Sequence, residues 1–376
     1  MIHISGIQLN LSYRDTDLPA IAARELRCAP ARITGCRLFR RSVDARRKPQ
    51  VRFTATLEVT VSGNEAALVQ HSRNRRAAVV SPTVYTVPTA PAMTHRPVVV
   101  GAGPAGLFAA LILARAGLRP LLLERGKPVD ERQADVERFR MTGQLDPSSN
   151  VLFGEGGAGT FSDGKLTTRI GDELCGFVTE VFLEHGAPKE IAWQQKPHVG
   201  TDLLRGVITS IRKEIESLGG EVHFNTALTG FERRDGQLVG IQTTDGAFPC
   251  EALVFAVGHS ARDTFGMLMD SGLVLECKPF SVGFRAEHLQ SEIEKSLYHE
   301  AAGHPALPRG EYQLSQHVEK RCVYTFCMCP GGQVVASASE TGRVVTNGMS
   351  YHARSGKNAN AAVVVSVGGE DFGGDP

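Results

Sequence analysis

The chain lacks the cysteine pattern of a dithiol enzyme. Its 376 residues include eight cysteines but no Cys-x-x-Cys pair, the arrangement on which disulfide reductases depend. Cys327 and Cys329 stand two residues apart in an alternating apolar segment, a spacing that would put both thiols on one face of a strand. Without further ligand residues nearby, such a pair more often packs in a core than binds metal. We therefore expect reduced thiols, no metal site and a cytoplasmic protein.

The sequence also lacks an excess of charge and a long apolar run. Its 41 Lys and Arg residues balance 40 Asp and Glu residues, so the formal net charge is +1. Such a balance gives no overall field that would attract nucleic acid or a membrane surface. The apolar stretch at residues 107–123 is interrupted by Arg115 and Arg119, which argues against a membrane span. We therefore expect neither nucleic acid nor a membrane as a partner.

Glycine, in contrast, is abundant and patterned. Residues 97–124 read PVVVGAGPAGLFAALILARAGLRPLLLE, in which Val98–Val100 predicts a buried parallel strand. The strand stops at Gly101, where a tight turn is needed. Gly103 lets the backbone approach a pyrophosphate, and Gly106 lets the following helix pack against the strand. The free N–H groups and the positive dipole end of that helix would face the phosphates.

The residues after this turn give the motif its context. Pro104 suits the first turn of a helix, and the small residues Ala110 and Gly117 lead into a second apolar strand. Glu124 closes that strand, at a position where a carboxylate accepts hydrogen bonds from a ribose diol and repels a 2′-phosphate. The segment therefore predicts a dinucleotide-binding βαβ unit that disfavours NADP. FAD and NAD remain as alternatives at this point.

Two later segments favour FAD. Residues 150–169, NVLFGEGGAGTFSDGKLTTR, predict a polar, glycine-rich loop that is too long for a simple connection. A planar isoalloxazine needs backbone at close range, which side chains would obstruct. Residues 252–258, ALVFAVG, predict a buried apolar strand that ends in glycine beside His259 and Ser260, as at the carboxyl end of a strand over a cofactor.

In this order and spacing, the three segments resemble the FAD-binding domain of the glutathione-reductase-type flavoproteins. GEGGAGTFSDGKLTTR and the later VVTNGMSYHAR, together with the N-terminal SVDARRKP, are similar more narrowly to a bacterial family of FAD-dependent dehydrogenases, once called NAD(FAD)-utilizing dehydrogenases. The resemblance covers nearly the whole chain. It implies FAD as the cofactor, hydride transfer by the flavin, a small-molecule substrate, and NAD(P)H docking transiently or a carrier as the redox partner.

The resemblance also assigns residues to the cofactor, one region at a time. At the pyrophosphate, the resemblance implies Gly101, Gly103, Ala105 and Gly106, with Pro104 in the same turn. On the adenosine side it implies Glu124 at the AMP ribose, Arg125 beside the adenosine, and Leu228, whose backbone would meet adenine. On the flavin side it implies Gly157, Ala158, Gly159 and Thr160, and it places Val257 and Gly258 at a second crossing near the pyrophosphate.

Catalytic residues are harder to name, because the flavin itself performs the hydride transfer. His259 is a candidate polar group near the flavin, and a structural hydrogen-bonding role is its alternative. Lys165 and Ser162 lie in the glycine-rich loop and could border the flavin or the substrate. No second Gly-x-Gly-x-x-Gly with a strand and a helix follows in the sequence, so we expect no built-in NAD domain.

The pattern predicts an α/β fold with three parts. Residues 1–90 predict a small α+β module of the split-βαβ kind, and residues 86–96 a proline-containing linker. Residues 95–276 predict a Rossmann-like FAD-binding domain with a parallel sheet, and residues 277–376 an antiparallel substrate-side sheet. The late glycine-rich segment and helix that normally complete such a flavin site are missing at the end. We therefore expect the last domain to be truncated, with weaker FAD retention and uncertain activity.

The N-terminal module leaves a second function class open. Helices are predicted at 17–26 and 64–71, and strands at 36–43 and 51–59 flank a turn at Lys48-Pro49-Gln50. Seven basic residues lie from Arg37 to Arg52, which would suit a flavin-containing factor that modifies or binds RNA or protein. The predicted strands lack the paired exposed aromatics of an RNA-recognition sheet, however, and this favours a solvated face or a protein-docking surface.

Overall fold

A computed structural model describes residues 1–46, 50–168 and 170–373. The chain forms two compact units. Unit 1 consists of residues 1–85, 165–199 and 289–311, and unit 2 consists of residues 86–164, 200–288 and 312–376. The predicted N-terminal module thus gains two later segments that the sequence analysis placed elsewhere. The predicted boundary at residues 276–277 falls inside unit 2.

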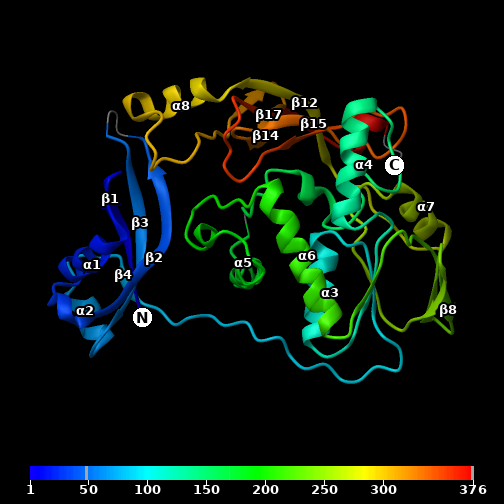
Figure 1. The fold of residues 1–376 in the computed structure, drawn as a ribbon, viewed down its shortest axis with the longest axis horizontal. Helices are drawn as coiled ribbons and strands as arrows, with labels where there is room; N and C mark the ends of the chain where they lie inside the picture. Colours follow the sequence, from blue (N-terminus) through cyan, green and yellow to red (C-terminus); the bar gives the residue numbers. More distant parts are fainter. Residues whose placement is uncertain (47–49, 169, 374–376) are drawn as a thin grey trace. The chain divides into compact units, whose positions relative to one another are not determined.

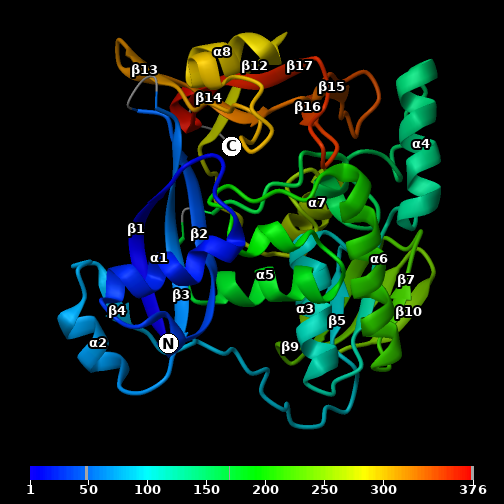
Figure 2. The same cartoon turned by 60° about the vertical axis from the view of Figure 1, so that its left-hand side comes forward.

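Unit 1 is built on a four-stranded antiparallel sheet in the order β2-β3-β1-β4. Its elements are β1 (Ile2–Leu9), α1 (Leu18–Leu26), β2 (Ile33–Asp44), β3 (Arg52–Val61), α2 (Glu65–His71) and β4 (Ala77–Val79). This βαββαβ sequence with that strand order confirms the predicted split-βαβ module. Figure 2 shows α1 lying across the sheet. The predicted turn between β2 and β3 falls largely on residues 47–49, which lie outside the described residues.

Strict alternation along β3 explains which face of this sheet is buried. Phe53, Ala55, Leu57 and Val59 are at most 2% exposed and pack with α1 and α2 in one apolar core. The side chain of Asn64 caps α2, since its Oδ1 accepts a hydrogen bond from the Ala67 N–H at 3.0 Å. Helix α1 has no side-chain cap of this kind. The carboxylate of Asp17 accepts from the N–H of Arg14, and so it fixes the 3₁₀ turn that precedes the helix.

The later segments of unit 1 join this module through contacts far apart in sequence. They contain α5 (Leu174–Glu184) and α8 (Gln290–Tyr298). The N–H of Arg41 on β2 donates to the carbonyl oxygen of Trp193 at 2.7 Å. The guanidinium of Arg41 lies over the rings of Trp193 and Phe53, 4.3 Å from each centroid. The presence of an arginine on a strand does not predict such contacts with a distant segment. The sequence prediction therefore assigned residues 1–90 and residues 165–199 to different domains.

Unit 2 contains the predicted parallel sheet. Its strands are β5 (Val98–Val100), β6 (Leu121–Leu123), β7 (Glu221–His223) and β11 (Leu253–Phe255), in the order β11-β5-β6-β7. Helices α3 (Pro104–Arg115) and α6 (Thr201–Ser217) pack together beside it (Figure 1). The predicted α/β, Rossmann-like fold class is therefore confirmed. One detail was wrong: β11 is an edge strand, the first in the order of this sheet over the described residues, and Val254 and Phe255 are 38% and 40% exposed.

Antiparallel sheets complete unit 2. A small sheet consists of β8 (Leu228–Arg234), β9 (Gln237–Thr243) and β10 (Gly246–Pro249). The turn from β8 to β9 is formed by Asp235 and Gly236, which both have positive φ, 52° and 79°. Beyond residue 277 the chain forms the predicted antiparallel region. Its strands are β12 (Phe280–Leu289), β13 (Ser315–Val318), β14 (Arg321–Cys329) and β17 (Asn358–Val367), with β15 (Gln333–Ala336) and β16 (Thr346–Met349) as a separate pair.

Two helices of unit 2 border the site described below, namely α4 (Val129–Thr142) and α7 (Arg262–Asp270). In β14, a bulge with φ of 47° at Cys327 interrupts the alternation that was expected to place Cys327 and Cys329 on one face. All eight cysteines are thiols rather than halves of a disulfide. Over the described ranges, no helix combines the length and apolarity of a membrane span, and no three His, Cys, Asp or Glu side chains gather in a way that could hold a metal ion.

Candidate functional site

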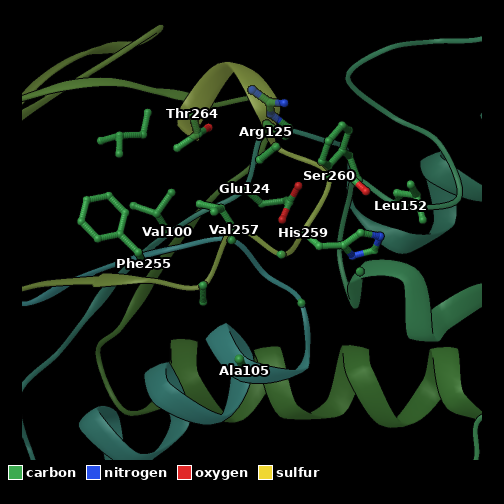
Figure 3. Close-up of a pocket in the computed structure, with 18 of the residues that line it drawn as sticks. Val100, Ala105, Glu124, Arg125, Leu152, Phe255, Val257, His259, Ser260 and Thr264 are labelled. Carbon is green, nitrogen blue, oxygen red and sulfur yellow. The ribbon is translucent and has the colours of Figure 1, made fainter. Parts of the chain in front are cut away.

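A cavity of about 510 Å³ lies at the carboxyl ends of β5, β6 and β11, the edge where open α/β sheets bind ligands. Five segments of unit 2 line it: the turn after β5, the end of β6, the glycine-rich loop, the start of β8, and the loop from β11 to α7. All the predicted cofactor residues except Gly106 and Thr160 are in this lining, together with His259 (Figure 3). The structure therefore brings residues as far apart in the sequence as Gly101 and His259 to one place.

The turn after β5 needs its glycines for two different reasons. Gly101 has a φ of +100°, and a Cβ there would overlap the carbonyl oxygen of Ala256. A Cβ at Gly106 would overlap the carbonyl oxygen of Gly101. A Cβ at Gly103, by contrast, would meet only the Cα of Gly157, at an ordinary 3.9 Å. Gly101 and Gly106 are thus required by packing, whereas Gly103 keeps open a space on the cavity side.

This turn leads into the N-terminus of α3, where an anion can be held. The first intrahelical hydrogen bond joins the N–H of Leu107 to the carbonyl oxygen of Gly103. The N–H groups of Ala105 and Gly106 come before it in the chain, so the helix itself offers them no acceptor. Such N–H groups and the positive end of the helix dipole favour a negatively charged group. A pyrophosphate fits the donors that this turn presents.

Glu124 is 5% exposed, and its carboxylate joins three backbone segments around the cavity. Oε2 accepts the N–H of Ala102 at 2.7 Å, and Oε1 accepts the N–H groups of Gly126 and Gly154, both at 2.9 Å. A carboxylate oxygen has two lone pairs, so Oε2 keeps one position for a further donor such as a ribose hydroxyl. The predicted ribose contact is compatible with this geometry, and Glu124 also fixes the walls of the site.

The glycine-rich loop is organised by Arg132 of α4, which the sequence analysis missed. The Arg132 side chain is fully buried, and its guanidinium donates to the backbone carbonyl oxygens of Asn150, Val151, Glu155 and Gly157 at 2.6–2.8 Å. Burial lowers the pKa of Arg132 to about 10, against the opposing effect of the nearby carboxylates of Glu124 and Glu155. Arg132 therefore stays charged at neutral pH.

The loop held in this way closes on the turn after β5. Gly157 has a φ of +60°, and a Cβ there would lie 3.0 Å from the Cα of Gly103. The only sequence signal for Arg132 is its helical spacing from Val129 and Val136, which puts it on the buried face of an otherwise strongly charged helix. Because arginine is rarely buried, this spacing alone did not predict that Arg132 would lie in the interior.

A second buried charge anchors the far end of the same loop. Asp163 and Arg354 are 1% and 5% exposed and form an ion pair, with Nε of Arg354 2.9 Å from Oδ1 of Asp163. The hydroxyl of Ser350 also donates to Asp163. Arg354 has a φ of +47°, and a Cβ at Gly331 would overlap its carbonyl oxygen. Residues 350–354 thus hold the loop from outside the nucleotide-binding segment.

The predicted catalytic candidates occupy different places. His259 is exposed and lines the cavity, directly after Gly258. Ser162 is outside the lining, and its hydroxyl donates to the carbonyl oxygen of Gly159 at 2.7 Å and accepts from the N–H of Gly164 at 3.0 Å. Lys165 belongs to unit 1. Thr160 is also outside the lining, where its hydroxyl bonds to the loop backbone.

The opposite end of the cavity carries Arg125. Its guanidinium lies 4.7 Å from the ring centroid of Phe153 and forms an ion pair with Asp263 of α7. Burial would raise the pKa of Asp263, but the hydrogen bond and the charge of Arg125 lower it below its ordinary value. Figure 3 shows Arg125 and Thr264 together, with Ala105 at the N-terminus of α3 on the other side of Glu124.

Comparison with known proteins identifies the cofactor of this chain. An FAD binding domain model matches residues 95–145, a model described as FAD-dependent protein, C-terminal domain-like, matches residues 279–376, and a domain of unknown function matches residues 1–60. An uncharacterized protein of Clostridium beijerinckii is 45% identical over 376 residues, which is 99% of this chain and 70% of the relative. The chain belongs to the same family as this protein, a family of flavoproteins.

Solved structures with similarity to the chain include flavoenzymes. NikD, an unusual amino acid oxidase essential for nikkomycin biosynthesis, is 13% identical with a TM-score of 0.33, and the match covers 73% of this chain and 70% of that one. CtdE in complex with FAD is 14% identical with a TM-score of 0.32, over 72% and 59%. L-amino acid deaminase from Proteus vulgaris is 13% identical with a TM-score of 0.31, over 70% and 63%. The chain spans less than two thirds of the deaminase.

FAD is the cofactor of this flavoprotein. The cavity fits such a group on three counts: helix N–H donors for a pyrophosphate, a free lone pair on Glu124 for a ribose, and a close approach of two glycine backbones where a side chain would intrude. The residues that would hold FAD are the lining residues of the turn after β5, Glu124, Arg125 and the glycine-rich loop.

Proposed function

We propose that the chain is an FAD-dependent oxidoreductase of the dehydrogenase type. In this proposal the pyrophosphate lies at the N-terminus of α3, the adenosine lies toward Arg125 and Leu228, and the flavin lies toward Gly157–Gly159. The observation that carries the proposal is that one cavity is lined both by the turn after β5 and by the glycine-rich loop. Bound FAD supplies the transfer of a hydride or of electrons.

The chain's own residues bind and orient the cofactor. Glu124 orients the ribose with the lone pair that its backbone contacts leave open. Arg132 holds the carbonyl groups of the loop in place, and Gly157, which has no side chain, presents its backbone to the cavity. His259 is the one candidate acid or base in the cavity lining that the sequence analysis named, and we propose that it holds a proton near the substrate.

The redox partner and the substrate are also proposals. The sequence holds one Gly-x-Gly-x-x-Gly turn with a strand and a helix, so a nicotinamide would dock on the flavin without a domain of its own. We propose NAD(P)H or a protein carrier in that role, and a small molecule as the substrate.

The test is an absorption spectrum of the purified protein, followed by anaerobic titration with NADH and with NADPH. We expect non-covalently bound FAD that is reduced by one of the two. The second step tests the variant His259→Asn. This substitution should lower the rate of turnover and change its pH profile, while the FAD content stays normal. A protein that takes up no FAD contradicts the assignment of the site. Bound FAD that neither nicotinamide reduces contradicts NAD(P)H as the direct partner.

A further inference from the structure

The near-zero charge of the chain conceals a basic module. Residues 1–85 contain thirteen arginines and one lysine against six acidic residues, a formal net charge of +8, whereas the rest of the chain carries −7. Charge asymmetry of this size within one chain indicates a polyanionic partner for the basic part. The use of arginine in place of lysine matters, because the planar guanidinium binds phosphate with two parallel hydrogen bonds.

Several of these arginines have no acidic partner. Among the described residues of the module, Arg24, Arg37 and Arg46 lie within 4.0 Å of a carboxylate. The guanidinium groups of Arg40, Arg73, Arg75 and Arg76 have no such neighbour, and all four residues are exposed. Like charges this close in sequence repel one another, and an anion that binds between them removes that repulsion.

Three of the four line one open hollow of about 600 Å³, together with Arg24, Glu25 and Asn74. The backbone that carries them is fixed. The N–H of Arg73 donates to the carbonyl oxygen of Glu25 at 2.8 Å, the amide of Asn74 donates to the carbonyl oxygen of Ser5 at 3.1 Å, and Oδ1 of Asn74 accepts the N–H of Arg76 at 2.8 Å. The arginine stems therefore start from defined positions rather than from a free loop.

One arginine of the hollow also contacts the sheet. Arg76 reaches β1, where a Cβ at Gly6 would lie 2.8 Å from its Nη1. On the face opposite the apolar core, Thr56 bonds to Ser5 and pairs in register with Arg40 of β2. The neighbouring Phe39 is 44% exposed, with its ring centroid 4.1 Å from that of His3. An exposed ring beside unpaired arginines is the combination on which single-stranded nucleic acid stacks.

We infer that the N-terminal module binds single-stranded nucleic acid, with Arg73, Arg75, Arg76 and Arg40 on phosphates and Phe39 against a base. An acidic peptide would also neutralise the arginines, but its carboxylates would not stack on the exposed ring of Phe39. The whole-chain charge argued against nucleic acid, and the distribution of that charge within the fold is what changes the inference.

The experiment measures fluorescence anisotropy of a labelled single-stranded RNA of roughly 16 nucleotides with the FAD-loaded full chain at several salt concentrations. The test variant is Arg73→Gln, Arg75→Gln and Arg76→Gln combined. The control makes the same charge change at exposed positions of unit 2, Arg140→Gln, Arg234→Gln and Arg343→Gln combined. Normal flavin absorbance shows that unit 2 is folded in both variants, and an unchanged thermal unfolding transition shows the same for unit 1.

We expect the dissociation constant to rise at least about tenfold in the test variant, and the slope of log affinity against log salt to fall by about 2, since each phosphate contact on a single strand contributes about 0.7. The control should bind like the wild type, and Phe39→Leu should weaken binding without changing the salt slope. Equal binding by test and control variants overturns the inference. So does competition by polyglutamate that is as strong as competition by unlabelled RNA, which would indicate an acidic protein instead.

Discussion

The two loops that form the FAD cavity are held in opposite ways. The turn from Gly101 to Gly106 is fixed by backbone fit over six residues, and its glycines leave no room for side chains at two of the three positions. The loop from residue 150 to 164 is fixed by the buried charges of Arg132 and Arg354, which come from a separate helix and from nearly two hundred residues further along the chain. The first device is local and steric, and the second is non-local and electrostatic.

The largest effect expected from this comparison is at Arg132. Arg132→Gln removes a guanidinium that satisfies several buried carbonyl groups, so we expect the free energy of unfolding to fall by about 3–5 kcal/mol and FAD to be lost. Urea unfolding and flavin content measure the two effects. Arg138→Gln, on the exposed side of the same helix, is the matched control and should change stability by less than about 1 kcal/mol. A fully stable Arg132→Gln protein would show that the loop does not depend on this side chain.

The same contrast explains what the sequence could predict. The turn after β5 and the helices predicted at 17–26 and 64–71 follow from neighbouring residues, and the structure has all three. Arg132 and the Asp163–Arg354 pair could not be foreseen, because charged residues ordinarily lie on the surface and only the fold buries these. The grouping of residues 165–199 with unit 1 escaped for the same reason, since it depends on Arg41 meeting Trp193.

A smaller effect is expected in the turn from Gly101 to Gly106, which is fixed by steric fit. Gly106→Ala places a methyl group onto the carbonyl oxygen of Gly101, and overpacking of this kind costs about 1–3 kcal/mol. Both apoprotein stability and FAD affinity should fall, as thermal unfolding and FAD titration would show. Gly206→Ala is the control within α6, where a Cβ meets nothing within 4 Å, and this variant should be unchanged or slightly more stable. Normal FAD binding by Gly106→Ala would contradict the packing argument.

The smallest effect concerns the exposed ion pair of Arg125 and Asp263. The lowered pKa of Asp263 means that its charged form stabilises the fold above its ordinary pKa, and that this contribution disappears as the pH falls through the lowered value. The side chain is 65% exposed, so Asp263→Asn should cost less than about 1 kcal/mol at pH 7. Urea unfolding of both proteins from pH 7 to pH 3 should show the difference become smaller toward the acid end. A difference that grows toward low pH has the wrong sign for this account.

The most direct test of the FAD site is an FAD titration of Gly103→Val apoprotein alongside its thermal unfolding. A Cβ at this position meets no protein atom closer than 3.9 Å, so the fold should remain nearly as stable as in the wild type. The space that the valine fills is the one assigned to the pyrophosphate, whose lost hydrogen bonds should raise the dissociation constant of FAD at least about a hundredfold. An unchanged dissociation constant in a stably folded variant would contradict the central claim that FAD binds across this turn.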